Sequence, residues 1–396
     1  SSYLKAISLN PNFADAYNNL GVTLRELRKL EESKSSYLKA ISLNPNFADA
    51  YNNLGFTLRE LGRLEESEAS FKKAIELRPD FPDAYNNMSL TLLSCKNFKK
   101  AFELSEWRWK TKLKIGDQLK STKPLWNGES NSSVFVWKEQ GIGDEIMFCS
   151  ILPELKTKSK KIILNCDKRL IPIFRRSLSR DIVYESNRET VKENKYDSHI
   201  PMGSLPRFFR NDLESFSKSS AGYLKADNNK TSVFITKLKK QLDVKIIGVS
   251  WYTNSDIQMS SFRNIKLKEL ISEINHPNIK FINLQYGDVS KELNDLKDNI
   301  GKEIIDFNEI NKKNDIDDLA SLMCACDLII TIDNSIVHLA GSLGIKTKAL
   351  LPFSADSRWG QKSAKSYLYD SVSLYRQTSL GDWDSVLKKL KKDILL

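Results

Sequence analysis

Two patterns of hydrophobic and polar positions divide this chain. In the first 110 residues, apolar side chains recur at the three- and four-residue spacing of a helix, as Leu54, Leu58 and Leu61 do. The spacing predicts one helix over Ala48–Leu61 and a second over Leu64–Leu77. Farther along, short apolar runs alternate with helical stretches, which is typical of an α/β fold.

The helical pattern repeats along the chain. Ser2–Gly21 and Ser36–Gly55 are identical, and Ser70–Ser89 is a looser third copy, each 34 residues after the one before. A two-helix unit of this period indicates a tetratricopeptide solenoid. The first residues read as the second helix of an earlier repeat, so we expect the chain to be a piece of a longer array or a processed one.

One polar position recurs in the first helix of each repeat: Asn19, Asn53 and Asn87. Asn is a mediocre helix former, so three in register suggest that something offsets its cost. The positions are either solvated or form a ladder on the concave face. Such a ladder would bind a peptide backbone through its amide donors and acceptors.

The α/β pattern begins at Ser132 and predicts two successive Rossmann-like domains with a cleft between them, separated by a break near Asn228–Leu242. The predicted strands are Ser133–Lys138, Lys161–Asn165, Ile182–Glu185, His199–Met202, Lys245–Trp251, Lys280–Gln285, Leu328–Asp333 and Thr347–Leu351. The predicted helices are Glu145–Leu155, Leu267–Ile274, Ile316–Cys326, Ile336–Leu343 and Asp382–Leu395. The predicted domains are a solenoid over 1–110, a linker over 111–131, a first Rossmann-like domain over 132–240 and a second over 241–396.

A glycine-rich turn follows the first predicted strand. Gly141 and Gly143 permit a tight turn, and the start of the next helix can hold an anion. The third glycine of a dinucleotide fingerprint is missing, which argues against a dehydrogenase. Asp144 is either the N-cap of that helix or a general base at the cleft.

A second polar turn follows the strand that ends at Asp333. Asn334 and Ser335 begin a helix whose free backbone N–H groups suit a diphosphate. His338 lies on the first turn of this helix, where it either packs or touches the same ligand.

Three further residues are placed near the cleft. Arg263 is a surface residue or a phosphate contact. Gln285 and Asp288 belong to a loop that follows a strand and faces the same cleft.

Charge and cysteine content limit the kinds of ligand and partner that the chain is expected to bind. Net charge is +11, but residues 1–110 carry 16 Lys/Arg and 14 Asp/Glu, so the basic excess lies in the second part. It indicates solvated faces or attraction for a nucleotide diphosphate or an anionic membrane surface, and we find no nucleic-acid module. Cys324 and Cys326 lack a second pair at zinc spacing, and buried reduced thiols suggest a cytoplasmic protein. No apolar run is long enough to cross a membrane.

Together these motifs resemble glycosyltransferase family 9, the heptosyltransferase-like family, in its bacterial members fused to tetratricopeptide repeats. The resemblance spans nearly the whole chain and is strongest over Asp333–Gly341. It implies a GT-B fold and an inverting, metal-independent transfer from a nucleotide sugar, with no cofactor. Asn334 stands where the family usually has Thr, and Ser335 where classical heptosyltransferases have Gly, so the donor need not be ADP-heptose.

The resemblance also implies roles for the cleft residues. Asp144 matches the proposed general base, Arg263 a residue that contacts the donor diphosphate, and Asp288 one that contacts the nucleoside. The turn of Asp333, Asn334, Ser335 and His338 would hold nucleotide and sugar, with Gly143 and Gln285 beside them. No metal site is expected.

Two hypotheses from different classes follow. In the first, the chain is a glycosyltransferase whose solenoid holds a protein acceptor or partner. In the second, it is a non-catalytic repeat adaptor whose GT-B part is inactive.

Overall fold

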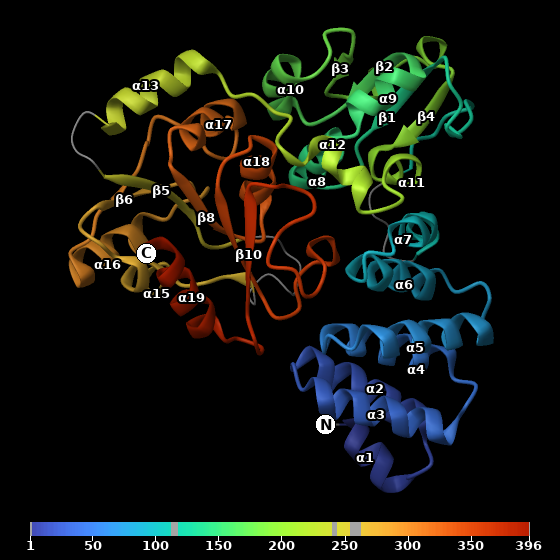
Figure 1. Cartoon of the computed structure of the whole chain (residues 1–396). Coiled ribbons are helices and arrows are strands. Elements are labelled where there is room, and N and C mark those ends of the chain that lie inside the picture. Colours follow the sequence, from blue (N-terminus) through green and yellow to red (C-terminus); the bar gives the residue numbers. More distant parts are fainter. Residues whose placement is uncertain (1, 112–117, 240–243, 254–262, 396) are drawn as a thin grey trace. The chain divides into compact units, whose positions relative to one another are not determined.

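The computed structural model describes residues 2–111, 118–239, 244–253 and 263–395, and contacts divide the chain into two compact units (Figure 1). The first unit comprises Ser1–Gln118, Arg210–Asp212 and Asp356–Lys362. The second comprises Leu119–Phe209, Leu213–Ala355 and Ser363–Leu396. Residues 112–117 of the predicted linker, and the predicted boundary at 240 and 241, lie outside the described residues.

The first unit is a tetratricopeptide array of paired helices. Its helices are α1 (Ser2–Leu9), α2 (Ala14–Glu26), α3 (Leu30–Leu43), α4 (Ala48–Glu60), α5 (Leu64–Leu77), α6 (Pro82–Ser94) and α7 (Phe98–Ser105), followed by the 3₁₀ turn η1 (Glu106–Lys110). The predicted pair over the second repeat is confirmed, with α4 one residue shorter than expected.

Glycine sets the distance between the paired helices. A Cβ atom at Gly21 would lie 2.6 Å from the Tyr37 ring, and one at Gly55 would lie 2.8 Å from the Phe71 ring. Each ring is fully buried against the helix backbone that faces it. A larger residue at either glycine would force the pair apart, which explains why the repeat carries glycine here.

The second unit contains two parallel sheets. The first sheet consists of β1 (Ser132–Trp137), β2 (Ser159–Asn165), β3 (Val183–Glu185) and β4 (Ser198–Pro201). The second consists of β5 (Lys245–Ser250), β6 (Ile279–Asn283), β7 (Ile304–Ile305), β8 (Leu328–Ile332), β9 (Thr347–Leu351) and β10 (Val372–Arg376).

Helices connect these strands. In the first half they are α8 (Ile142–Cys149), α9 (Leu152–Lys158), α10 (Ile171–Ser177), α11 (Pro206–Phe209) and α12 (Ser217–Ser220). In the second half they are α13 (Asn228–Lys239), α15 (Leu267–Ile274), α16 (Ser290–Ile300), α17 (Ile316–Cys324), α18 (Ser335–Ser342) and α19 (Trp383–Leu395).

Strand order fixes where a ligand site can lie. The first sheet runs β3-β2-β1-β4 and the second β10-β9-β8-β5-β6-β7, with all pairs parallel. In the second sheet the order reverses between β5 and β8, which is the Rossmann arrangement. The chain is therefore a tetratricopeptide array followed by two Rossmann-like sheets, consistent with a GT-B-like α/β region, as predicted.

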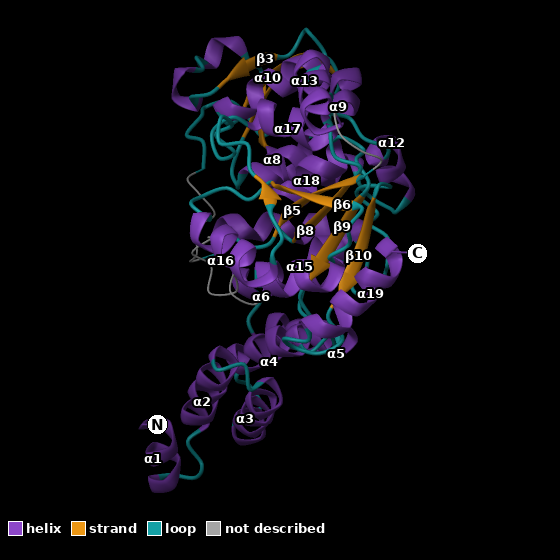
Figure 2. Ribbon diagram, turned by 90° about the vertical axis from the view of Figure 1, so that its left-hand side faces the viewer, coloured by secondary structure: helices purple, strands orange, loops and turns teal. Residues whose placement is uncertain are grey.

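Both faces of the second sheet are covered by helices (Figure 2). Ile246 of β5 packs into the same cluster as residues of α17 and α18, whereas Ile247 packs with residues of α15 and α19. The first cluster also holds Val134 of β1, so one hydrophobic core joins the two halves. This explains why these strands read as continuous apolar runs rather than alternating ones.

Several elements differ from the predictions, among them α10, α16 and β7, which were not predicted. The helix expected over Glu145–Leu155 is split into α8 and α9, because Pro153 has no backbone N–H and occupies the first turn of a new helix. The break expected near Asn228–Leu242 contains α13. Strand β10 was not predicted at all, and it ends at Arg376.

Candidate functional site

The site begins where two helices meet at a glycine. Helix α8 follows β1 and α18 follows β8, so both start at the carboxyl ends of their strands. A Cβ atom at Gly143 would lie 3.1 Å from Cδ2 of His338 and 3.5 Å from Cα of Ser335. The first turn of α8 therefore rests directly on the first turn of α18, and the structure brings predicted residues of both halves together.

Asp144 lies on this same turn of α8. The N-cap of α8 is Gly141, so the alternative in which Asp144 caps the helix is wrong. Asp144 is the third residue of the helix and half-buried, and its Oδ2 lies 3.6 Å from where a Gly141 Cβ would stand. A carboxylate in the first turn is favoured by the positive end of the helix dipole.

Asn334 holds the start of α18. Its Oδ1 accepts the backbone N–H of Ile336 at 3.0 Å, and its Nδ2 donates to Ser250 Oγ at 2.9 Å. Ser250 ends β5, so the Asn334 side chain spans the point where the strand order reverses. The amide at this position thus caps the helix and ties β5 to β8.

Gln285 also serves this junction, and it is almost fully buried. Its Oε1 accepts from Ser250 Oγ at 2.9 Å and from the backbone N–H groups of Trp251 at 3.0 Å and Tyr252 at 3.1 Å. The side chain thereby fixes the backbone of Trp251 and Tyr252 directly after β5.

Asp333 lies between two arginines. Arg263 Nη1 is 3.9 Å from Asp333 Oδ2, so these two predicted residues are brought together. Arg376 is not among the donor-binding residues predicted from the sequence. Burial lowers its pKa to about 10, and the nearby Asp333 carboxylate counteracts that effect. The signal that could have found it is a basic residue at the carboxyl end of a strand, but β10 itself was missed.

His338 is buried under α8. Its Nδ1 lies 3.0 Å from the hydroxyl oxygen of Tyr369, and its Cδ2 edge faces Gly143. A Cβ atom at Gly341 would lie 2.3 Å from the Tyr369 ring, so glycine admits that ring to the helix. Tyr369 thereby fixes the orientation of the imidazole.

Asp288 lies at the exposed start of α16. Its Oδ1 accepts the backbone N–H of Ser290 at 3.0 Å, and this hydrogen bond lowers its pKa. Its neighbour Tyr286, rather than Asp288 itself, lines the cavity described next.

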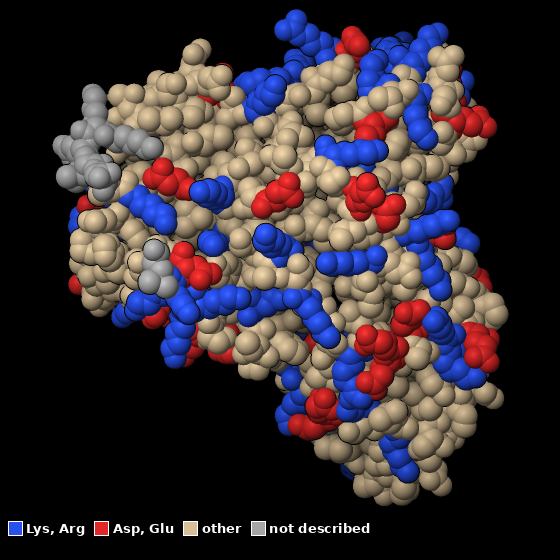
Figure 3. Space-filling view, in the orientation of Figure 1, with Lys and Arg blue, Asp and Glu red and all other residues tan. Residues whose placement is uncertain are grey.

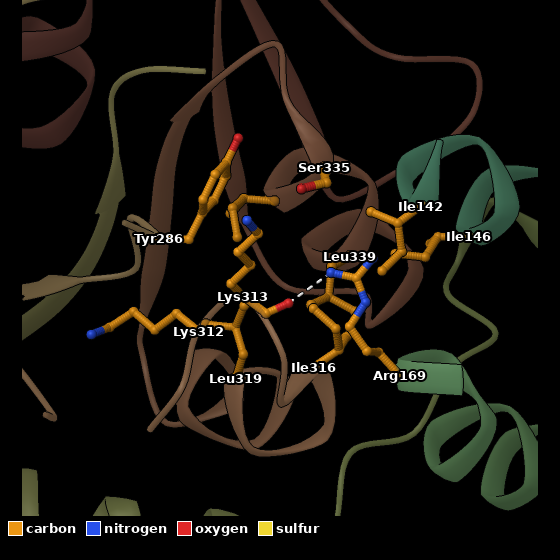
Figure 4. A pocket seen from close by; sticks show the side chains of 11 residues that line it. Ile142, Ile146, Arg169, Tyr286, Lys312, Lys313, Ile316, Leu319, Ser335 and Leu339 are labelled. Carbon is orange, nitrogen blue, oxygen red and sulfur yellow. Dashed lines mark hydrogen bonds between the residues drawn. The ribbon is translucent and has the colours of Figure 1, made fainter. Parts of the chain in front are cut away.

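A cavity of about 190 Å³ lies beside the two helix starts (Figure 4). Its walls are Ile142, Ile146, Arg169, Tyr286, Lys312, Lys313, Ile316, Leu319, Ser335, Ile336 and Leu339. Arg169 comes from the first half and donates from Nη1 to the Lys313 carbonyl at 2.8 Å. Both halves of the second unit therefore contribute to one pocket that includes Ser335.

Sequence reasoning also missed Glu145, which follows Asp144. Its side chain is 3% exposed, and burial raises its pKa to about 7. Its Oε2 accepts the backbone N–H of Asp167 at 2.7 Å, and its Oε1 is 3.9 Å from Lys138 Nζ. A buried carboxyl with a raised pKa beside a candidate site is a candidate functional position.

The asparagine positions of the array link one repeat to the next. Asn53 Nδ2 donates to Asn18 Oδ1 at 3.0 Å, and Asn87 Nδ2 donates to Asn52 Oδ1 at 3.1 Å. These bonds offset the helix cost of Asn. Asn19, at the same position in the first repeat, is exposed.

Surface charge, the cysteines and the helix lengths were also compared with the sequence predictions. Lys and Arg side chains are spread over the face in Figure 3 with Asp and Glu between them. In the described part of the chain, the cysteines are free thiols and no three His, Cys, Asp or Glu side chains group as metal ligands would. No helix there has the length and apolar character to span a membrane.

Two family models match the array. One, described as a tetratricopeptide repeat, matches residues 2–34 and 36–69, and another, described as a TPR repeat, matches residues 57–93. Neither covers the α/β region, but protein FlbA of Caulobacter vibrioides (strain ATCC 19089 / CIP 103742 / CB 15) is 26% identical over 318 residues, or 76% of this chain and 52% of FlbA. The chain thus spans about half the length of this curated relative.

Two solved structures are similar to about a quarter of this chain. A MamA crystal structure has a TM-score of 0.26 at 25% identity, covering 27% of this chain and 62% of MamA. A structure of Pseudomonas aeruginosa PilF has a TM-score of 0.25 at 24% identity, covering 26% of this chain and 49% of PilF.

Proposed function

We propose that this protein is an inverting, metal-independent glycosyltransferase that uses a nucleotide sugar. The observation that carries the proposal is the contact at Gly143. It places Gly143, the residue before Asp144 on the helix after β1, against Ser335 and His338 on the helix after β8. In this proposal Asp144 is the proton acceptor from one half, and the start of α18, from the other half, binds the anion.

This arrangement suits an inverting transfer. As the acceptor hydroxyl attacks the sugar, Asp144 would take its proton. Charge develops on the leaving diphosphate, and the first backbone N–H groups of α18 would stabilise it without a metal. Glu145 and Asn334 keep the two helix starts in position.

We further propose that the repeat array holds a protein or peptide acceptor. Asn53 and Asn87 each use one amide N–H to bond the preceding repeat. Among the described residues, the amide oxygen and the second N–H of each side chain have no other partner, so these groups would meet a peptide backbone.

Replacing Asp144 by Asn tests the proposal. The full chain is first titrated calorimetrically with ADP, UDP, GDP and CMP without added metal, and sugar transfer from the matching donor is then measured. Because a general base contributes about 10²–10⁴-fold to rate, Asp144→Asn should lower transfer by that much and leave nucleotide affinity within about twofold.

The matched control is Asp181→Asn, an exposed carboxylate whose side chain is 73% exposed. Transfer that survives Asp144→Asn would remove Asp144 as the base. If no nucleotide binds the wild-type chain, the adaptor hypothesis takes its place.

A further inference from the structure

The polar side chains at the turn before α18 are mostly engaged with one another or with Tyr369. Arg263 faces Asp333 at 3.9 Å, and Arg376 is buried near the same carboxylate. His338 lies beneath α8 against Tyr369. These groups shape the turn before α18, so another source of positive charge has to face a ligand at Ser335.

The cavity beside Ser335 supplies that charge from its own walls. Of its lysines, Lys312 pairs with Asp306 at 2.5 Å. Lys313 has no carboxylate within ion-pair distance among the described residues. In Figure 4 the Lys313 side chain runs toward the side of the pocket with Tyr286 and Ser335, whereas Lys312 extends away.

Arg169 lies on the opposite wall of the cavity, and hydrogen bonds fix its guanidinium. Its Nε and Nη2 donate to the two Asp167 carboxylate oxygens at 2.8 and 2.9 Å, and its Nη1 donates to the Lys313 carbonyl at 2.8 Å. This pairing lowers the pKa of Asp167 to about 2. A guanidinium has five N–H donors, so two remain without a partner in the described part of the chain.

The remaining walls are aliphatic, from residues such as Ile142, Ile336 and Leu339. Apolar walls lower the local dielectric and so strengthen a contact between a cation and an anion. The volume of about 190 Å³ is several times the share of one water molecule, roughly 30 Å³. A few convergent donors in a mostly apolar pocket are typical of a small-molecule site.

We infer that Lys313 and Arg169 bind the diphosphate of a nucleoside diphosphate in this cavity, next to Ser335. The inference rests on the proposed function and assigns the charge that replaces a metal. Lys313 contacts the anion directly, while Arg169 contacts it and also holds the Lys313 loop through the carbonyl bond. Since Arg169 comes from the first half, donor binding would engage both halves.

The test compares nucleoside diphosphates with the matching nucleosides, by calorimetry on the full chain without metal. A hydrogen bond to a charged group contributes about 1.5–3 kcal/mol, so Lys313→Met should weaken the diphosphate roughly 10- to 100-fold. It should leave nucleoside affinity within about twofold. Arg169→Gln should weaken the diphosphate as well, and higher salt should narrow both differences.

The matched control is Lys346→Met, which removes an exposed lysine just before β9, at the opposite end of the strands. If the Lys313→Met and Lys346→Met variants bind the nucleoside diphosphate with equal affinity, the inference is overturned and the proposed function stays intact. If the wild-type chain binds no nucleoside diphosphate, both fall together. Equal loss of nucleoside and diphosphate would also overturn it, because the contact would not be with phosphate.

Discussion

At the residue scale, Glu145 makes stability depend on pH. Burial raises its pKa to about 7, whereas an unfolded Glu titrates near 4.3. The folded chain therefore holds the proton more tightly, and stability from this group is complete below about pH 4.3 and is lost as pH rises through about 7. Glu145→Gln keeps an oxygen for the Asp167 N–H, so its free energy of unfolding should exceed that of wild type at pH 8, by on the order of 3 kcal/mol at most.

Urea unfolding at pH 5 and pH 8 measures this difference. Glu189→Gln serves as the control, since the Glu189 side chain is 74% exposed. If the free energies of unfolding of Glu145→Gln and wild type differ by the same amount at both pH values, the raised pKa does not belong to Glu145.

From the sequence, the positions of the polar site residues were predicted better than the role of each residue. Asp144 stands out because it follows a glycine turn after a strand. Glu145 does not, because its partners Lys138 and Asp167 come from separate loops. Gln285 was expected at the donor, yet it points into the junction below because three donors converge on its oxygen.

At the element scale, the two identical repeat segments offer an internal control. Asn53 bonds Asn18, whereas Asn19 is exposed. Asn19→Ala should raise the free energy of unfolding by about 0.5 kcal/mol through helix propensity. Asn53→Ala should lack this gain, because it breaks a hydrogen bond and leaves the buried Asn18 oxygen unsatisfied, a cost of about 1 kcal/mol.

Far-UV circular dichroism during urea unfolding of the full chain compares the two variants. Equal effects would show that the Asn53–Asn18 bond adds no stability. If in addition a peptide acceptor loses affinity in Asn53→Ala but not in Asn19→Ala, the ladder acts in binding as well as in packing.

Periodic elements were predicted closely, and irregular ones were not. Helix α5 matches its predicted bounds because a 34-residue period repeats its pattern. Helix α13 was missed because its sequence, NNKTSVFITKLK, exposes Val233 and Ile235 and shows no clear apolar face. Strand β10 was missed because its five residues become a strand only through pairing with β9.

At the scale of the whole molecule, an ion pair joins the two halves of the second unit. Arg176 of α10 donates to both oxygens of Asp317 on α17, at 2.6 and 2.9 Å. Asp317 is 7% exposed, and Lys230 lies 3.5 Å from it. Arg176→Met should lower the free energy of unfolding by about 2 kcal/mol, because it leaves a mostly buried carboxylate with Lys230 as its remaining ion-pair partner among the described residues.

Arg175→Met is the matched control. This neighbouring guanidinium has no carboxylate within ion-pair distance among the described residues, and it stacks 5.8 Å from the Tyr184 ring. Urea midpoints followed by tryptophan fluorescence compare the two variants with wild type. Equal midpoints for both would show that the Arg176–Asp317 pair does not hold the halves together.

The fold class was predictable because it depends on periods and strand–helix alternation, which are local. The meeting of α8 and α18 was not, because it depends on Gly143 and Ser335, which lie far apart in sequence and touch only after both sheets form. The first cluster of buried residues, which includes Val134 and Ile246, draws the sheets together.

The contact between neighbouring repeats has a consequence for the length of the array. Asn53 bonds Asn18 just as Asn87 bonds Asn52, so each junction repeats the one before it. A further copy of 34 residues inserted at such a junction would meet complementary partners on both sides. The array can thus lengthen or shorten by whole repeats, because each added repeat restores the same junction.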